Sequence, residues 1–341
     1  MTERPRRGPG SWRGARRGST LLGAALTGIV GLAALASPVL APHGVDDRFP
    51  DLLDAPPTLP HVFDGGRLRP PFIHPWKLVN RLEQRYEPDA GTSVPLVWFR
   101  GGRLVSSSDD SRAPLLILGA DSYGRDVFSR LLFGSRVSIA LSLAAAAGAA
   151  VLGGLFGALA GYLGGAADDL ITRTADAVML LPAMYVALAL RALLPPVVPP
   201  AIVFVGLAAI FAVIGAPFVL RGVRDIVGTE RRRESATAAV ALGAGPVHLL
   251  VRHLLPAARG FIATQMTMLT PAFIVAEATL SYVGFGFGPP VTSWGTMLQE
   301  TSNVRAFSDF PWLLSPAAAI FAFVLGLNLL IEDRRARRTL G

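Results

Sequence analysis

The chain carries few side chains suited to chemistry, and their spacing fits no catalytic pattern. The five histidines are His43, His61, His74, His248 and His253. None lies in an H-E-x-x-H motif and the chain has no cysteine, so we expect no metal site. The chain has neither a G-x-x-x-x-G-K phosphate-binding loop nor a G-x-S-x-G elbow. We therefore predict no catalytic residue and no cofactor, and the energy for any uphill process must come from a partner or an ion gradient.

Glu277 stands apart because it interrupts a long apolar run, where an ionisable side chain is a candidate functional residue. A carboxylate that faces lipid costs about 2.5–3.5 kcal/mol at mid-membrane, so we expect Glu277 to face the protein interior. Two roles fit this position: lining a transport pathway, or holding a helix pair together through polar contacts. We favour the second role.

A basic, alanine-rich stretch broken by glycine, RRRESATAAVALGAGPVHLLVRHLLP, begins at Arg231. Thr229 is predicted to cap a helix that ends at Gly243, and Pro246 is predicted to start a second short helix. The last proline of the stretch, Pro256, is predicted to end that second helix. Such a pair forms a knob with small residues, and a partner protein can approach it closely. An interfacial helix that lies on anionic lipid is the alternative interpretation, and composition does not separate the two.

Within the second helix of this pair, the spacing predicts one apolar stripe. It consists of Val247, Leu250, Val251 and Leu254. His248 and His253 are five residues apart and are therefore predicted to point to different faces of the helix.

The elements that must position these residues are transmembrane helices. The chain has 341 residues and is 51% hydrophobic and only 16% charged, whereas soluble chains are about a quarter charged. A span needs about 20 mainly apolar residues, and six runs are candidates. They are 18–42, 137–167, 177–190, 192–220, 260–276 with its apolar continuation, and 310–331. In the second run, Gly153, Gly157 and Gly161 have a spacing that permits close helix packing without specifying the partner helix.

The arginine clusters at both ends predict the topology. Cytoplasmic loops carry the excess of Lys and Arg, so both termini are predicted to be cytoplasmic, which an even number of spans satisfies. The net charge of +8 is therefore attributed to topology, and no nucleic-acid partner is expected. Cleavage of the first span as a signal peptide is the alternative, but its apolar run is longer than the 7–15 residues of a signal core.

The predicted organisation follows from these spans. It comprises a basic cytoplasmic N-terminus (1–19), transmembrane helix 1 (20–42), an extracytoplasmic segment (43–117), an amphipathic interfacial helix capped by Asp121 (118–136), a five-helix core (137–332) with a cytoplasmic loop (228–258), and a basic tail (333–341). The segment 43–117 contains two similar motifs, FDGGRL and FRGGRL, each typical of a β-hairpin turn. The fold class is an all-α membrane protein with a small extracytoplasmic insertion.

The basic stretch resembles the EAA loop of permease subunits of binding-protein-dependent ABC transporters, whose pattern is E-A-A, three residues, G, and a tail near R-H-x-L-P. Ala238 and Ala239 match the two alanines, Gly243 matches the glycine, and RHLLP matches the tail. The family's first acidic position falls on Thr237, which departs from the pattern. Glu234, one turn earlier, is acidic in the dipeptide and oligopeptide branch as well.

Two further stretches resemble that branch: LGADSYGRDVFSRLLFGSRVS and AEATLSYVGFGFGPPVTSWGTML. One span, an outer segment and five spans fit its C-type subunit. The resemblance covers 118–330, and the segment 43–117 is longer than in most members, as in a sub-branch tied to peptide and peptide-like antibiotic uptake. The resemblance implies the MetI-like fold of type I ABC importers.

The resemblance also implies a function: a non-catalytic permease subunit of an ATP-driven importer for di- or oligopeptides, in the bacterial inner membrane. The implied partners are a second homologous permease, two ATPase subunits that hydrolyse ATP, an extracytoplasmic binding protein and membrane lipid. Arg252 and His253 are expected to brace the loop against the chain's own helices. The residues implied for ATPase docking are Glu234, Ala238, Ala239, Gly243, Ala244, Arg252, His253 and Pro256.

Three alternatives remain open at this point. One is an ion-driven secondary transporter that uses Glu277, although the two halves show no internal repeat. Another is ABC import of nickel or a different non-peptide solute. A membrane-tethered outer domain that binds or cuts something is the third, and residues 43–117 contain no catalytic pattern to support it.

Overall fold

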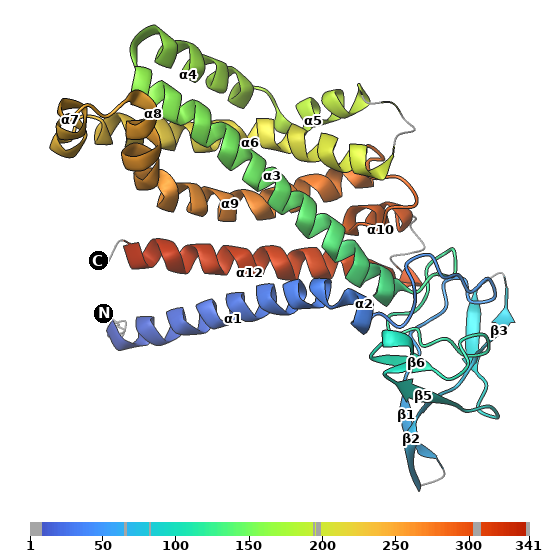
Figure 1. The fold of residues 1–341 in the computed structure, drawn as a ribbon. Helices are drawn as coiled ribbons and strands as arrows, with labels where there is room; N and C mark the ends of the chain where they lie inside the picture. Colours follow the sequence, from blue (N-terminus) through green and yellow to red (C-terminus); the bar gives the residue numbers. More distant parts are fainter. Residues whose placement is uncertain are drawn as a thin grey trace, which may run out of the picture. The chain divides into compact units, whose positions relative to one another are not determined.

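The computed structural model describes residues 9–64, 67–81, 83–193, 195, 199–302 and 308–338 (Figure 1). The chain divides into two compact units. The first comprises 1–26, 139–280 and 323–341, and the second comprises 27–138 and 281–322. Parts of several predictions lie outside the described residues: the first arginines of the N-terminus, the Gly65–Gly66 turn and the end of the basic tail.

Helices make up most of the described chain. They are α1 (Pro9–Leu35), α2 (Ser37–Leu40), α3 (Val127–Leu163), α4 (Gly165–Leu180), α5 (Ala183–Ala192), α6 (Pro200–Glu230), α7 (Glu234–Ala241), α8 (Pro246–Leu249), the π-helix η2 (Leu250–Leu254), α9 (Leu255–Tyr282), α10 (Trp294–Glu300), the 3-10 helix η3 (Pro311–Leu314) and α12 (Ser315–Arg338). Among the described residues, five helical stretches are long and apolar enough to cross a membrane, and six if α4 and α5 form one broken span.

The third predicted span, 177–190, is not one straight helix. It falls on the junction of α4 and α5, which are bent by 91°. Pro182 cannot donate a backbone hydrogen bond, and the residue before a proline is driven out of the helical region. Leu181 accordingly has a ψ of 136°, and the helix breaks there.

In the first unit, the glycines of α3 select α6 as their packing partner. An added Cβ at Gly153, Gly157 or Gly161 would lie 2.4–2.5 Å from a backbone carbonyl oxygen of α6. The three carbonyls belong to Ala216, Leu220 and Arg224. Only glycine permits such an approach, so the two helix backbones touch along three turns. This contact fixes the end of α6, from which the loop to α9 begins.

The described part of the second unit contains six strands, all within the predicted extracytoplasmic segment. They are β1 (His61–Asp64), β2 (Arg67–Ile73), β3 (Trp76–Asn80), β4 (Arg85–Pro88), β5 (Val94–Trp98) and β6 (Val105–Ser107). One antiparallel sheet has the order β1-β2-β5-β6, and β3 pairs with β4. The segment is therefore a small β-domain attached to a helical protein.

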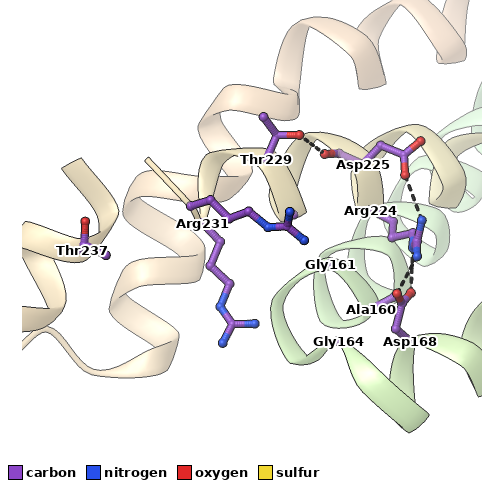
Figure 2. A pocket seen from close by; sticks show the side chains of 11 residues that line it. Ala160, Gly161, Gly164, Asp168, Arg224, Asp225, Thr229, Arg231 and Thr237 are labelled. Atoms are coloured by element: carbon purple, nitrogen blue, oxygen red, sulfur yellow. Dashed lines mark hydrogen bonds and ion pairs between the residues drawn. The ribbon is translucent and has the colours of Figure 1, made fainter. Parts of the chain in front are cut away.

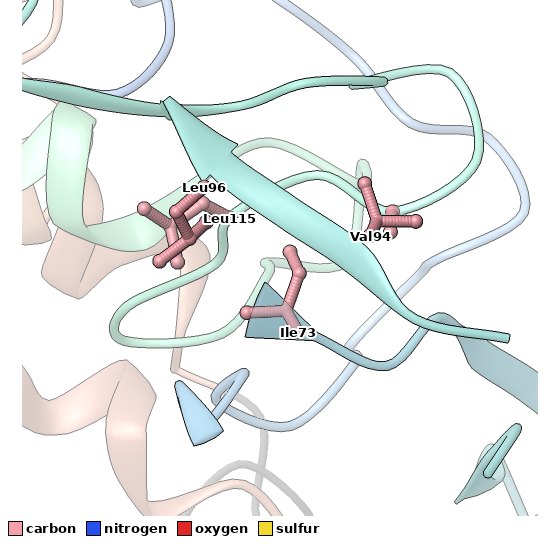
Figure 3. Packing of buried hydrophobic residues seen from close by; sticks show 5 residues of the cluster. Ile73, Val94, Leu96 and Leu115 are labelled. Carbon is pink, nitrogen blue, oxygen red and sulfur yellow. The ribbon is translucent and has the colours of Figure 1, made fainter. Parts of the chain in front are cut away.

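A small apolar core holds this β-domain together. Ile73, Val94, Leu96 and Leu115 are all buried and belong to one cluster, which Figure 3 shows around β5. The two glycine-glycine motifs both connect paired strands: β1 to β2, and β5 to β6 through the 3-10 helix η1 (Arg100–Gly102). The hairpin prediction is thus confirmed for the strands on either side of each motif.

The predicted interfacial helix over 118–136 is not a separate element, because α3 begins at Val127 and continues to Leu163. The preceding residues form a turn in which Gly124 has a φ of +71°. Asp121 accepts hydrogen bonds from backbone groups of this turn, so its assignment as the helix cap is wrong. Asp126 fills that position, since its carboxylate accepts from the backbone N–H of Phe128 and of Ser129.

Candidate functional site

The helix α7 ends in a Schellman motif that explains three of the residues singled out in the sequence. The Gly243 N–H donates to the Val240 carbonyl, and the Ala244 N–H donates to the Ala239 carbonyl, both at 3.0 Å. This pattern requires a left-handed residue directly after the helix, and Gly243 has a φ of +87°. Its predicted role as a helix stop is confirmed. Ala239 and Ala244, which are joined by the second of these bonds, are both half-buried.

The predicted start of this helix is wrong. Thr229 lies in the last turn of α6, and its hydroxyl donates to the Asp225 carbonyl 2.8 Å away. The residue before α7 is Arg233, whose extended backbone begins the helix without a side-chain cap. Glu234 stands in the first turn, where a negative charge stabilises the helix dipole, and it is exposed.

The predicted end of the second helix is also wrong. Pro256 is the second residue of α9, which follows α8 and η2 without a break. The Leu255 N–H bonds the carbonyl of Leu250, five residues earlier, so the chain makes a π turn directly before the proline. The ring of a proline crowds the carbonyl four residues earlier, and a wider turn gives it room. The same turn brings the rings of His248 and His253 to 6.0 Å, which corrects their assignment to different faces.

The loop exposes a group of apolar side chains whose exposure was not predicted from the sequence. Leu242 is 89% exposed and Val247 is 74% exposed, and Val240 and Val251 are exposed as well. We call these four residues the apolar rim. The predicted stripe in the second helix is therefore half wrong, because Val247 and Val251 face out while Leu254 is buried. The sequence feature that could have indicated this exposure is Leu242, a large apolar residue directly before the glycine turn.

The remaining predicted docking residues are accessible. Ala238 is exposed beside the half-buried Ala239, and Arg252, His253 and Pro256 are exposed. Arg252 makes no hydrogen bond or ion pair with another described residue, and His253 contacts the ring of His248. The expected bracing of the loop by Arg252 and His253 is therefore not seen. Ala236 and Leu249, by contrast, are buried.

A pocket of about 800 Å³ lies beside this loop (Figure 2). Its walls come from the end of α3, the start of α4, the end of α6 and α7. Asp168 on α4 receives two hydrogen bonds from Arg224 on α6, at 2.7 and 2.5 Å. This bidentate pair ties α4 to α6 next to the loop, and a guanidinium and a carboxylate are well matched for it.

Glu277 is fully buried in α9. Its exposed fraction is 0%, so the carboxyl group faces protein within the described chain, as the sequence analysis expected. Its role as a pathway residue or a helix-pair residue stays a prediction.

The second unit has an ionic cluster of its own, formed by Asp121, Arg125, Arg130 and Glu300. Arg130 is buried, and its Nη1 lies 2.5 Å from Asp121 and 2.6 Å from Glu300. Arg125 bonds the same two carboxylates at 2.9 and 2.7 Å. Two positive and two negative side chains thus alternate, and the charge balance makes burial of Arg130 tolerable. The cluster fastens α10 to the turn before α3.

A buried histidine from a distant part of the chain, His43, contacts Asp126 at the end of the same turn. The His43 ring is 2% exposed, with its Nδ1 3.2 Å from Asp126 and its Nε2 3.6 Å from Asp110. Burial alone would lower the pKa of His43, but the two carboxylates outweigh it and raise the pKa to about 9. At neutral pH the ring is therefore protonated and forms part of the structure of this unit.

The comparisons with known proteins cover this loop. Residues 153–332 match the family described as the binding-protein-dependent transport system inner membrane component. The chain is 34% identical over 221 residues to the oligopeptide transport system permease protein OppC of Bacillus subtilis, a match that covers 64% of this chain and 69% of that protein. It is 29% identical over 243 residues to the dipeptide transport system permease protein DppC of Haemophilus influenzae, covering 71% and 76%. It is 34% identical over 218 residues to the glutathione transport system permease protein GsiD of Pectobacterium atrosepticum, covering 64% and 70%.

Proposed function

Because the chain belongs to the family of binding-protein-dependent transport system inner membrane components, we propose that it is the transmembrane permease subunit of an ATP-driven importer for di- and oligopeptides or peptide-like solutes. The observation that carries the proposal is the loop between α6 and α9. There a rigid helix end, closed by Gly243, presents Ala238 next to the exposed apolar rim.

The proposed complex contains this chain, a second homologous permease, two ATPase subunits and an extracytoplasmic binding protein. ATP hydrolysis belongs to the ATPase subunits, since the chain has no phosphate-binding loop. The chain is a multi-pass membrane protein. We place it in the bacterial inner membrane with both termini in the cytoplasm, because the arginine clusters at its ends favour that side. In this orientation the loop faces the ATPase subunits.

The docking surface has a simple physical logic. Exposed apolar side chains such as Leu242 and Val247 lose their contact with water when a partner covers them, which stabilises a complex by about 25 cal/mol for each Å² of apolar area. The small side chains of Ala238 and Ala239 let the partner's backbone approach α7 closely. Such an interface typically depends on a few buried anchors surrounded by nearly neutral contacts.

The test is recovery of the ATPase subunits with the Ala238→Glu, Ala239→Glu double variant. The two new carboxylates add bulk and charge where close packing is needed, so we expect the ATPase subunits to be lost in a pull-down while the second permease stays bound. The matched control is Ala166→Glu, Ala167→Glu at the start of α4, which is also an exposed alanine followed by a half-buried one. Undiminished ATPase recovery with the first variant, or equal loss with the control, contradicts the docking assignment.

The substrate class rests on the relatives' names, which specify oligopeptides, dipeptides and glutathione. These molecules share peptide bonds and charged ends, so we propose that class for this chain. Uptake of a labelled dipeptide, a labelled pentapeptide and labelled nickel by cells with and without the gene tests it. Loss of nickel uptake alone in the deletion strain would replace the peptide assignment.

A further inference from the structure

The pocket beside the loop contains more positive charge than its own carboxylates neutralise. Three arginines line it, Arg224, Arg231 and Arg232, together with two aspartates, Asp168 and Asp225. Arg224 engages both aspartates: it bonds both oxygens of Asp168 and, at 3.0 Å, one oxygen of Asp225. Arg231 and Arg232 therefore have no carboxylate partner among the described residues.

These two arginines are held at the pocket by different means. A hydrogen bond from Nη1 to the Tyr162 carbonyl anchors Arg231, and its guanidinium lies 5.0 Å from the centre of the Tyr162 ring. Most of its N–H groups remain available as donors. The exposed side chain of Arg232 makes no hydrogen bond with another described residue. Figure 2 shows Arg231 between Thr237 on α7 and the turn that contains Gly164.

The other walls offer space without a competing acceptor side chain. Ala160, Gly161, Gly164 and Gly228 contribute backbone and at most a methyl group. The Thr237 hydroxyl donates to the carbonyls of Glu234 and Arg233, at 3.0 and 3.1 Å, so its hydrogen atom is already engaged at the start of α7. A volume of about 800 Å³ lies within the range of about 300–1,000 Å³ that small-molecule sites occupy.

We propose that this pocket binds a phosphate group through Arg231 and Arg232, carried either by an anionic phospholipid or by a free phosphate. The planar fork of a guanidinium matches two phosphate oxygens, and such charge-assisted bonds are about twice as strong as neutral ones. The inference rests on the proposed orientation, which puts these arginines at the cytoplasmic surface, where anionic headgroups and free phosphate both occur.

A bound phosphate connects the elements that surround the loop. Its oxygens would bond residues just after α6 while its bulk fills the space between the α3–α4 turn and α7. It thereby resists movement of α7 relative to α6. The expected consequence is regulatory: the importer couples ATP hydrolysis to uptake more tightly when the site is filled.

The test uses the complete importer, purified and placed in nanodiscs of phosphatidylcholine or of phosphatidylcholine with phosphatidylglycerol. Native mass spectrometry counts retained phosphatidylglycerol, and equilibrium dialysis with labelled inorganic phosphate measures the free ion. The variant is Arg231→Gln, Arg232→Gln. The control is Arg233→Gln, which removes one positive charge from the neighbouring arginine, outside the pocket, that pairs with Glu230 at 3.1 Å.

We expect the double variant to bind one of the two probes at least about tenfold more weakly, since hydrogen bonds to charged groups contribute more than one factor of ten in affinity. The control variant should bind it normally. Loss of phosphatidylglycerol identifies a lipid site, and loss of inorganic phosphate identifies a free-ion site.

Two results would overturn the proposal. One is equal binding of both probes by wild type and double variant. The other is release of the ATPase subunits by the double variant without any change in phosphate or lipid binding, which would assign the arginines to the protein interface. Peptide uptake by the wild type in phosphatidylcholine is measured in parallel, so a failure of the importer assignment is seen separately.

Discussion

Replacement of Gly243 by alanine should weaken docking of the ATPase subunits without a steric clash. An added Cβ at Gly243 meets no atom within 4 Å, so the substitution acts on the backbone alone. The φ of +87° lies in the left-handed region, which costs a residue with a Cβ about 1–2 kcal/mol. If the Schellman turn must form for docking, this energy reduces the apparent affinity by about 5- to 30-fold.

The chain supplies a matched control two residues away. Gly245 also has open space around an added Cβ, but its φ is −71°, which alanine adopts without strain. Gly243→Ala and Gly245→Ala therefore add the same methyl group to the same loop and differ in backbone cost. Gly243→Asn should lie between wild type and Gly243→Ala, because asparagine tolerates the left-handed region better than alanine does.

The assay is titration of the purified permease pair with the ATPase subunits, followed by substrate-stimulated ATP hydrolysis in proteoliposomes. We expect the order wild type, Gly243→Asn, Gly243→Ala in affinity, with Gly245→Ala close to wild type and all permease pairs stable. Equal weakening by Gly243→Ala and Gly245→Ala would refute the reasoning, because their backbone costs differ. So would normal affinity of Gly243→Ala, which would mean that the turn does not limit docking.

Three further predictions concern other parts of the chain. Gly157→Ala puts a Cβ 2.5 Å from a carbonyl oxygen of α6 and should lower stability by about 1–3 kcal/mol in thermal unfolding, whereas Gly154→Ala, with its nearest atom at 3.7 Å, should be nearly neutral. Glu277→Gln should weaken assembly with the second permease and leave the pH profile of uptake unchanged; intact assembly with an altered profile would favour the pathway role. His43 has a pKa raised from 6.5 to about 9, so its stabilising contribution is complete below pH 6.5 and is lost as pH rises through 9. Thermal unfolding should show a loss on the order of 3 kcal/mol over that interval, and His43→Gln should remove this pH dependence.

The sequence predicted features that depend on local composition. Long apolar runs predicted the spanning helices, and Gly243 predicted the end of α7, since both follow from the preferences of a single stretch of chain. Features that depend on a distant partner were not predicted. The spacing of Gly157 and its neighbours permits close packing, but the choice of α6 depends on carbonyls about 60 residues away.

The two wrong helix boundaries at the loop have one physical origin: each was predicted from a single residue that favours a helix start or a helix end. Thr229 is a good cap in isolation, yet its hydroxyl bonds a carbonyl inside α6, because the apolar face of that helix continues to the buried Val227. Pro256 is a good stop in isolation, yet it is tolerated in the first turn of α9 after a π turn. Burial of a helix face thus outweighed the local preferences of Thr229 and Pro256.

The arrangement around α6 suggests how movement of the loop reaches the membrane helices. Backbone contacts at Gly153, Gly157 and Gly161 join α6 to α3, and the Arg224–Asp168 pair joins it to α4. Neither contact contains a long apolar side chain that can change rotamer and absorb a displacement. The connection from α6 to α7 is three residues long. We infer that a force on α7 moves α3, α4 and α6 as one body, so that the bend at Pro182 between α4 and α5 becomes the nearest point at which this body can flex.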